Sequence, residues 1–194
     1  MSVASARQSP HIACIVLAAG LSSRIAPRNK LLEPVGGEPM VRRVVAIALA
    51  SGARPVIVVT GHDASRVTEA LEGLDVVTIH NPSYAQGLST SLRVGLGALA
   101  GGIDGTLICL GDMPWIEADV LKALMAAFAE TGRDAICIPV HQGRRGNPVL
   151  WGSAYWPEMM EISGDRGAKS LAAQHESRVV QVDVMTDSIF EDLD

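Results

Sequence analysis

The sequence predicts one doubly wound α/β domain built around a mainly parallel sheet. Short apolar runs alternate with stretches of helical periodicity along most of the chain, which is the pattern of parallel strands covered by helices on both faces. With 194 residues, 48% of them hydrophobic, the chain is long enough to enclose one sizeable core. Polar, glycine-containing segments follow several of the apolar runs, which marks the edge of the sheet where ligands bind in such folds.

The apolar runs are predicted to be strands because they are short and rich in the branched residues that strands favour. They are Ile12–Leu17, Val56–Thr60, Val76–Ile79, Thr106–Leu110, Ala135–Val140 and Val179–Val184. Most of these runs are apolar at nearly every position, so we expect the strands to be buried on both faces of the sheet.

Segments of helical spacing lie between these runs. After Pro39, which suits the first turn of a helix, apolar residues recur at helical spacing from Met40 until the pair Ser51-Gly52 ends the pattern. The other predicted helices are the region around Val67–Leu71, then Leu88–Leu99, Glu117–Glu130, Ala154–Met160 and Ala168–Gln174. The leucines of the second of these, Leu88 included, form one stripe that is assigned to the core.

The alternation changes in the last third of the chain. His141–Gly146 is a basic, glycine-containing turn, and Pro148–Trp151 has an extended pattern, so a late hairpin-like excursion is predicted. The predicted organisation is a flexible N-terminal segment over residues 1–10, one domain over 11–187 and an acidic C-terminal tail over 188–194.

Composition excludes several classes of function. A net charge of −5 argues against a general nucleic-acid binder, which is usually basic. Met1–Pro10 lacks the apolar core of a signal peptide, and no apolar run approaches the ~20 residues of a membrane span. Each of Cys14, Cys109 and Cys137 lies in an apolar run, so we expect free, buried thiols rather than disulfides or a zinc site. A cytoplasmic protein without nucleic-acid or membrane partners is expected.

The segment after the first predicted strand has the composition of a phosphate-binding loop. Leu17-Ala18-Ala19-Gly20 is followed by Arg24 and Lys30. Gly20 can adopt backbone angles closed to other residues, small neighbours let backbone N–H groups turn toward an anion, and the two cations add a guanidinium fork and a point charge. The G-x-x-x-x-G-K-[ST] and G-x-G-x-x-G motifs are absent. The alternative is an ordinary strand-to-helix turn with basic surface residues.

Carboxylates at strand ends are candidate metal ligands. Asp112 follows the run Thr106–Leu110 within Gly111-Asp112-Met113-Pro114, and Mg²⁺ typically takes one or two carboxylates together with phosphate oxygens and water. The alternative for Asp112 is the N-cap of the following helix. Asp165 is the candidate second carboxylate ligand. The alternative role for Asp165 is to cap the helix that begins near Ala168.

Hydroxyl groups collect where the helix from Leu88 begins. Ser89, with Thr90, Ser91 and Gln86 beside it, has the chemistry to hydrogen-bond a base or a ribose. The same side chains equally suit capping of the helix that they open, so both interpretations stand at this point.

Taken together, the ordered motifs resemble the nucleotidyltransferases that attach nucleotides to the molybdenum cofactor, and among them most of all the cytidylyltransferases. The likeness extends from about Ile12 to Gln174. The motifs that carry it are Leu17–Arg24 with Asn29–Leu32, Gln86–Leu92, Gly111–Pro114, Arg145–Val149 and Gly164–Ala168.

The resemblance implies a Rossmann-like fold of the nucleotide-diphospho-sugar transferase type. It also implies a reaction in which CTP, with Mg²⁺ as cofactor, gives CMP to the terminal phosphate of a molybdopterin-type acceptor and pyrophosphate leaves. Ala19 stands where guanylyltransferase relatives carry a second glycine, which favours CTP over GTP. The usual Met-Gly after the loop arginine is Ile25-Ala26 here, and this departure leaves the detailed shape of the loop open.

The resemblance also implies roles for individual residues. The nucleotide-binding set is Leu17, Ala18, Ala19, Gly20, Arg24, Lys30, Ser89 and Asp112. Arg24, Lys30 and Asp112 form the catalytic set. Asp112 and Asp165 are the implied metal ligands, and Arg145 and Asn147 are the implied acceptor-binding residues.

Other substrates and partners stay open at this stage. They are GTP as the nucleotide, a sugar phosphate or another phosphorylated metabolite as the acceptor, and a molybdoenzyme apoprotein or maturation factor as a protein partner. A nucleotide-binding maturation factor without catalytic activity is the remaining alternative.

Overall fold

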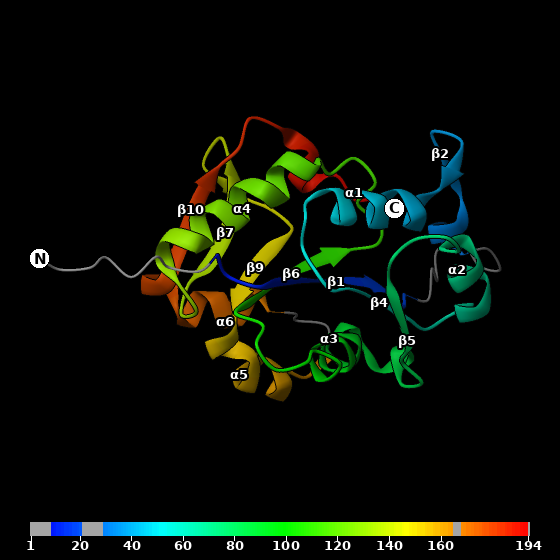
Figure 1. Cartoon of the computed structure of the whole chain (residues 1–194), viewed down its shortest axis with the longest axis horizontal. Helices are drawn as coiled ribbons and strands as arrows, with labels where there is room; N and C mark the ends of the chain where they lie inside the picture. The colour runs from blue at the N-terminus through cyan, green and yellow to red at the C-terminus, as the bar shows by residue number, and fades with distance from the viewer. Residues whose placement is uncertain (1–8, 21–28, 165–167, 194) are drawn as a thin grey trace, which may run out of the picture.

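A mostly parallel sheet runs through the centre of the computed structural model, which describes residues 9–20, 29–164 and 168–193 (Figure 1). Within these residues the strand order is β10-β7-β9-β6-β1-β4-β5, and β8 pairs with β7. The strands are β1 Ile12–Ala18, β4 Val56–Thr60, β5 Val77–His80, β6 Gly105–Leu110, β7 Ile136–His141, β8 Arg144–Arg145, β9 Val149–Gly152 and β10 Val179–Asp183. A separate two-stranded ribbon joins β2 Pro34–Val35 to β3 Glu38–Pro39.

β1 is an interior strand of the sheet and pairs in parallel with β4 on one side and β6 on the other. Ile15 is in register with Ile57 of β4 and with Ile108 of β6. Because all three strands run in the same direction, their carboxyl ends meet at one edge of the sheet. The predicted doubly wound, mainly parallel arrangement is confirmed.

The predicted hairpin excursion is part of the main sheet. β7 turns back into β8, and β9 then inserts between β6 and β7, antiparallel to both. A glycine at the end of β9 permits this insertion, because a Cβ on Gly152 would overlap the Arg133 carbonyl oxygen.

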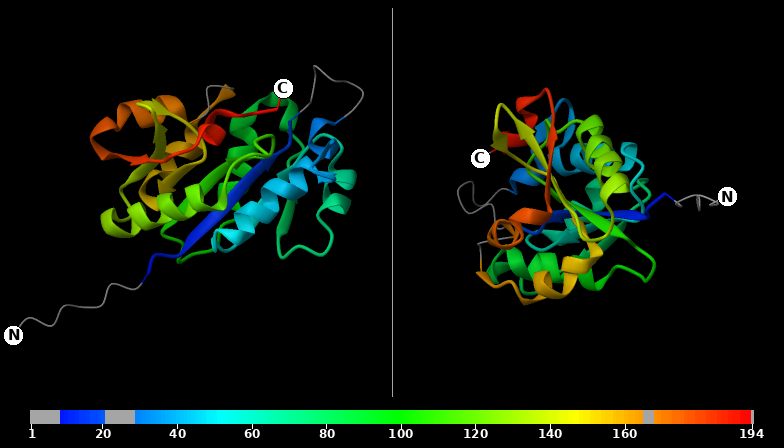
Figure 2. Two further views of the ribbon diagram at one scale, coloured as in Figure 1. Left: turned by 90° about the horizontal axis from the view of Figure 1, so that it is seen from above. Right: turned by 90° about the vertical axis from the view of Figure 1, so that its left-hand side faces the viewer.

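Helices cover both faces of the sheet (Figures 1 and 2). They are α1 Met40–Ala50, α2 Ala64–Ala70, α3 Leu88–Gly97, α4 Ala118–Thr131, α5 Trp156–Glu161 and α6 Lys169–Gln174. Side chains of successive strand residues point to opposite faces, so β1 contributes to two cores. Cys14 and Val16 pack with residues of α1, α2 and α4, whereas Ile15 and Leu17 pack with residues of α3, α5 and α6.

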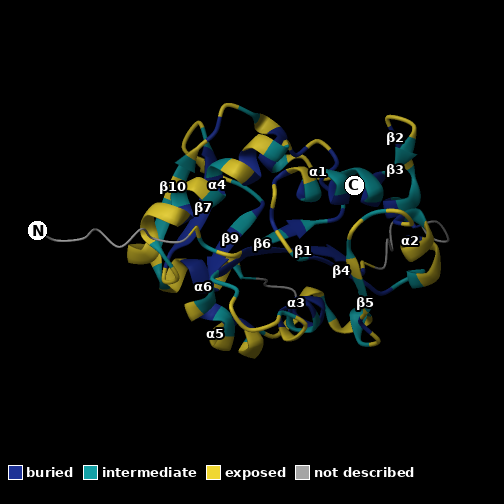
Figure 3. Cartoon of the chain, in the orientation of Figure 1, coloured by how far each residue is buried: buried dark blue, intermediate teal, exposed yellow. Residues whose placement is uncertain are grey.

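Burial follows this layering, with dark strands inside and exposed residues on the outer faces of the helices (Figure 3). All seven residues of β1 are buried, as the near-continuous apolar run predicted. The boundaries differ slightly from the predicted ones: α4 begins at Ala118, and a short 3-10 turn over Ser153–Tyr155 precedes α5. None of the helices in the described part of the chain is both long and apolar enough to cross a bilayer.

The segment after β10 folds back over the carboxyl edge of the sheet. It contains the 3-10 helix η6, Asp187–Phe190, in which Ile189 is fully buried. A Cβ on Gly146 would lie 2.5 Å from the Ile189 carbonyl oxygen, so the glycine allows the two segments to approach closely. The acidic sequence predicted as a tail over 188–194 therefore packs on the domain over its described residues.

Candidate functional site

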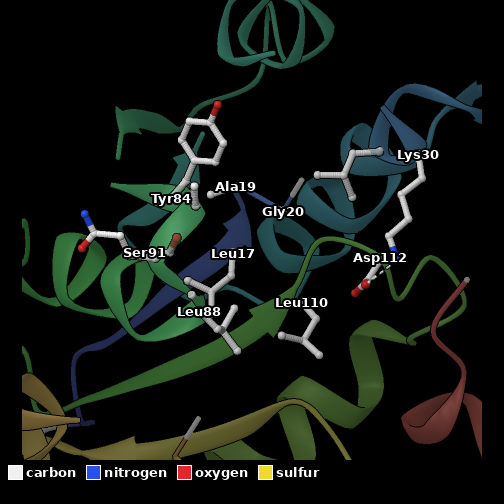
Figure 4. A pocket seen from close by; sticks show the side chains of 13 residues that line it. Leu17, Ala19, Gly20, Lys30, Tyr84, Leu88, Ser91, Leu110 and Asp112 are labelled. Atoms are coloured by element: carbon white, nitrogen blue, oxygen red, sulfur yellow. Dashed lines mark ion pairs between the residues drawn. The ribbon is translucent and has the colours of Figure 1, made fainter. Parts of the chain in front are cut away.

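A cavity of about 530 Å³ opens at the carboxyl ends of β1 and β6 (Figure 4). Its walls come from the end of β1, from the 3-10 helices η1 (Lys30–Leu32) and η2 (Tyr84–Gln86), from the start of α3 and from the end of β6. The residues that line it are Leu17, Ala19, Gly20, Lys30, Leu31, Tyr84, Ala85, Gln86, Gly87, Leu88, Ser91, Leu110 and Asp112. Among the described residues, the lining therefore combines apolar side chains with one cation and one carboxylate.

Lys30 and Asp112 form an ion pair at the rim of this cavity. Lys30 Nζ lies 3.0 Å from Asp112 Oδ2, and the two side chains are 18% and 25% exposed, so solvent still reaches them. Asn29 starts the 3-10 helix that carries Lys30, because its side chain accepts a hydrogen bond from the Leu31 N–H at 3.1 Å. The sequence thus brings a cation and a carboxylate from two separate loops to one point.

Asp112 is held against the end of β1 rather than used as a helix cap. The N–H of Gly111 donates to the Leu17 carbonyl oxygen at 3.0 Å, and a Cβ on Gly111 would touch that same oxygen. The N-cap of α4 is Glu117. The capping alternative for Asp112 is therefore excluded, and its carboxylate faces the cavity (Figure 4).

A close contact between three segments forms the wall opposite Lys30. A Cβ on Gly61 would lie 2.6 Å from Tyr84 Cβ and 2.7 Å from the Ala19 carbonyl oxygen. Glycine at this position therefore lets η2 approach the segment after β1, and Tyr84 closes that side of the cavity (Figure 4).

The hydroxyl groups at the start of α3 have different surroundings. The Asn81 side-chain amide donates to Thr90 Oγ1 at 2.8 Å and to Ser91 Oγ at 3.0 Å, so these two hydroxyls help to fix the loop before α3. Ser91 also lines the cavity. Ser89 is buried, its Oγ has no hydrogen-bond partner in the described part of the chain, and it is not among the lining residues.

Most of the residues predicted for the nucleotide are gathered at this cavity. Leu17, Ala19, Gly20, Lys30 and Asp112 line it. Ala18 is buried in the core between two lining residues. Arg24 and Asp165 lie outside the residues that the structure describes.

The two residues predicted for the acceptor do not line the cavity. Arg145 lies on β8, and its guanidinium donates to both carboxylate oxygens of Glu176, at 2.9 and 2.5 Å. These hydrogen bonds lower the pKa of Glu176 and raise that of Arg145. The N–H of Asn147 donates to the Ile189 carbonyl oxygen at 2.9 Å, which ties this loop to the C-terminal segment.

The oxygen ligands at the cavity suit a hard cation that takes most of its ligands from phosphate and water rather than from the protein. Within residues 9–20, 29–164 and 168–193, no group of three or more His, Cys, Asp or Glu side chains could hold a metal ion. Asp112 supplies one carboxylate beside the cavity. That fits Mg²⁺, which commonly binds one or two carboxylates and completes its shell with phosphate oxygens and water.

Some lining residues were missed by sequence reasoning. Leu88 was assigned to the core with the leucine stripe, but this is wrong: Leu88 is 40% exposed and lines the cavity. It occupies the first position of α3, at the wall of the cavity, and helical spacing alone does not reveal this exposure. Tyr84 carried no motif signal, and its position depends on the contact at Gly61.

The family of the chain follows from comparison with known proteins. The sequence model of the MobA-like NTP transferase domain matches residues 14–179. The molybdenum cofactor cytidylyltransferase of Escherichia coli is 32% identical over 140 residues, which are 72% of this chain and 69% of that protein. The bifunctional protein GlmU of Clavibacter sepedonicus is 34% identical over 131 residues, 66% of this chain and 26% of that protein. The matched region thus spans about a quarter of the GlmU relative.

Solved structures share the fold. A nucleotidyl transferase from Methanothermobacter superposes with a TM-score of 0.78 and 27% identity, covering 91% of this chain and 88% of that one. A Mycobacterium tuberculosis protein, Rv0371c, crystallised in complex with manganese, superposes with a TM-score of 0.71 and 26% identity, covering 90% of each chain. With its sequence match and its fold in agreement, the chain belongs to the family of MobA-like nucleotidyltransferases.

Proposed function

We propose that this nucleotidyltransferase transfers CMP from CTP to the terminal phosphate of a molybdopterin-type acceptor, with Mg²⁺ as cofactor and pyrophosphate as the second product. The observation that carries the proposal is the pairing of Lys30 with Asp112 beside the cavity at the ends of β1 and β6. The similarity to the molybdenum cofactor cytidylyltransferase supports the choice of acceptor and nucleotide.

The nucleotide is assigned to the cavity of about 530 Å³. Leu17, Leu88 and Leu110 provide apolar surface for a base or ribose, and Tyr84 closes one side. The triphosphate is assigned to the rim at Gly20 and Lys30, where an ammonium donates hydrogen bonds to phosphate oxygens. Arg24 is proposed to add a bidentate contact to the same phosphates.

The proposed reaction is an in-line displacement at the α-phosphorus. An oxygen of the acceptor phosphate forms the new bond, the bond from the α-phosphorus to the bridging oxygen breaks, and pyrophosphate leaves with that electron pair. The attacking phosphate is already ionised, so no general base is needed. The contribution of the chain is to position the groups and to neutralise charge on the leaving pyrophosphate, which is the proposed task of Lys30 and Arg24.

Mg²⁺ is assigned to the carboxylate of Asp112, with Asp165 proposed as the second ligand. When bound, the metal would supply charge neutralisation at the phosphate oxygens. The manganese complex of the structurally similar mycobacterial protein supports a divalent cation in this fold. The acceptor is assigned to the side of Arg145 and Asn147, whose loop contacts the C-terminal segment.

A sugar phosphate is the second candidate acceptor, favoured by the similarity to GlmU. A pyrophosphate-release assay distinguishes the two candidates. The purified protein is incubated with CTP or GTP, Mg²⁺ and either a molybdopterin-type acceptor or a panel of sugar phosphates. Release that requires CTP and the pterin is the expected result. Release with a sugar phosphate alone would move the protein to the second candidate, and no release with any pair would contradict both.

A further inference from the structure

The C-terminal segment, residues 184–193, crosses the edge of the sheet and contacts Lys30 and Asp112 at the rim of the cavity. It is anchored as far as Phe190: Thr186 caps η6 with its hydroxyl, Ile189 is fully buried, and the ring of Phe190 lies 4.2 Å from the Arg144 guanidinium. The last described residues differ, because Glu191 and Asp192 are exposed. The anchored part can therefore stay in place while residues 191–193 move.

Leu193 joins Lys30 and Asp112 in a closed set of contacts. The N–H of Leu193 donates to the Asp112 carbonyl oxygen at 2.9 Å, and Lys30 Nζ donates to the Leu193 carbonyl oxygen at 3.1 Å. Together with the 3.0 Å pair between Lys30 and the Asp112 carboxylate, each of the three residues contacts the other two. The C-terminal ribbon passes beside Asp112 in Figure 4.

We propose that residues 191–193 form an autoinhibitory clasp on the nucleotide site. The Leu193 carbonyl oxygen takes one of the three donors of the Lys30 ammonium, so it competes with a triphosphate oxygen for that ammonium. A nucleotide that displaces the clasp gains this donor. The inference rests on the proposed function, because it requires Lys30 to be a phosphate ligand.

The negative charge of residues 191–193 indicates that the clasp opposes nucleotide binding rather than assisting it. Glu191 and Asp192 add two carboxylates next to Leu193, which is in contact with the proposed phosphate ligand. A triphosphate is anionic, and like charges at short range repel one another, although salt screens such exposed groups. A segment that assisted binding would instead bring positive charge or hydrogen-bond donors to the phosphates.

The test compares nucleotide binding by the full chain and by a chain that ends at Phe190. The truncation keeps the buried Ile189 and Phe190 and removes the clasp. Calorimetric titration with CTP and Mg²⁺ is expected to give a dissociation constant about 2- to 10-fold lower for the shortened chain, since one hydrogen bond no longer competes. The difference is expected to shrink at high salt as the repulsion from Glu191 and Asp192 is screened.

Two point variants test the backbone contact without shortening the chain. Leu193→Pro removes the N–H that binds the Asp112 carbonyl oxygen, so it is expected to tighten CTP binding as the truncation does. Leu193→Ala is the matched control: it shortens the side chain but keeps the N–H, and its dissociation constant is expected to stay nearer to that of the full chain.

Each result decides a different claim. Equal or weaker CTP binding by both the truncated chain and Leu193→Pro would overturn the clasp while leaving the proposed function in place. If neither the full chain nor the truncated chain bound CTP, GTP or ATP, the proposed function would fail, and the clasp with it. Melting temperatures of the variants show whether each one is folded before it is titrated.

Discussion

Lys30 Nζ lies 3.0 Å from Asp112 Oδ2, although the two residues belong to different loops of the sheet edge. The pair joins a cation suited to phosphate with a carboxylate suited to a divalent cation. Each side chain balances the charge of the other. Binding of a metal–triphosphate complex would give each of them a new partner.

Replacing Asp112 is expected to abolish transfer while leaving the fold intact. Asp112→Asn keeps the size of the side chain but removes its charge, and we expect kcat to fall by at least about 100-fold, the usual cost of one lost electrostatic contact in the transition state. Asp119→Asn is the matched control, because Asp119 is an exposed carboxylate paired with Lys122 on α4. Full activity of Asp112→Asn in a pyrophosphate-release assay would contradict the assignment.

Replacing Lys30 is expected to weaken binding of the triphosphate. Lys30→Ala removes charged hydrogen bonds, and the dissociation constant of CTP should rise by about 10- to 100-fold. Lys122→Ala removes a cation of the same type from an exposed pair, where little change is expected. Calorimetric titration measures both constants, and equal affinity of Lys30→Ala and the unmodified chain would argue against a phosphate contact.

A methyl group at position 61 is expected to disturb the wall of the cavity. Gly61→Ala would place Cβ 2.6 Å from Tyr84 Cβ, so Tyr84 must shift; the expected loss of stability is about 1–3 kcal/mol, with weaker CTP binding. Gly97→Ala is the control, because nothing lies within 4 Å of its Cβ and alanine suits a helix better than glycine. Denaturant unfolding measures the two stabilities, and equal effects would show that the contact at Tyr84 is unimportant.

The pair of Arg145 with Glu176 gives a prediction about pH. Hydrogen bonds from Arg145 lower the pKa of Glu176 in the folded chain, so the contribution of the pair is present above the ordinary carboxyl pKa and is lost as the pH falls through the lowered value. Because Glu176 is exposed, the effect on stability should be small. An NMR titration should show a low midpoint for Glu176 that returns to the ordinary range in Arg145→Gln. An unchanged midpoint would contradict the pairing.

The cysteines are expected to be unreactive in the folded chain. Cys14, Cys109 and Cys137 are buried and free, and Cys14 Sγ lies 3.5 Å from Cys109 Sγ. The hydrogen bond to Cys109, with burial, raises the pKa of the Cys14 thiol, and burial raises that of Cys137 to about 11. Thiolates are the reactive form, so a thiol reagent should label no cysteine in native buffer and all of them in denaturant. Rapid labelling of the native protein would contradict this account.

The sheet could be predicted from sequence because its strands are nearly continuous apolar runs. Ile12–Ala18 needs no tertiary information to be recognised as a buried strand, and the cavity lies at its end as the topology requires. The ambiguity at Asp112 could not be settled in this way, because the sequence pattern does not fix the residue at which the helix after Asp112 begins. Only the structure assigns the N-cap to Glu117.

Contacts between segments far apart in the chain could not be predicted from the sequence pattern. The place of Leu193 beside Lys30 depends on the path of the chain after β10, which is fixed by the burial of Ile189 against Gly146. The exposure of Leu88 depends on the cavity that forms between the start of α3 and the ends of β1 and β6. Local periodicity predicts neither the contact of Leu193 with Lys30 nor the exposure of Leu88, since both arise from packing between elements far apart in the chain.

Calorimetric titration of CTP, GTP and ATP into the full chain, with Mg²⁺ and again with EDTA, shows whether the cavity at Lys30 and Asp112 is a metal-dependent nucleotide site. We expect CTP to bind more tightly than GTP or ATP and EDTA to abolish this preference. Tighter binding of GTP would contradict the choice of nucleotide. Absence of binding by all three nucleotides would contradict the assignment of the cavity at Lys30 and Asp112.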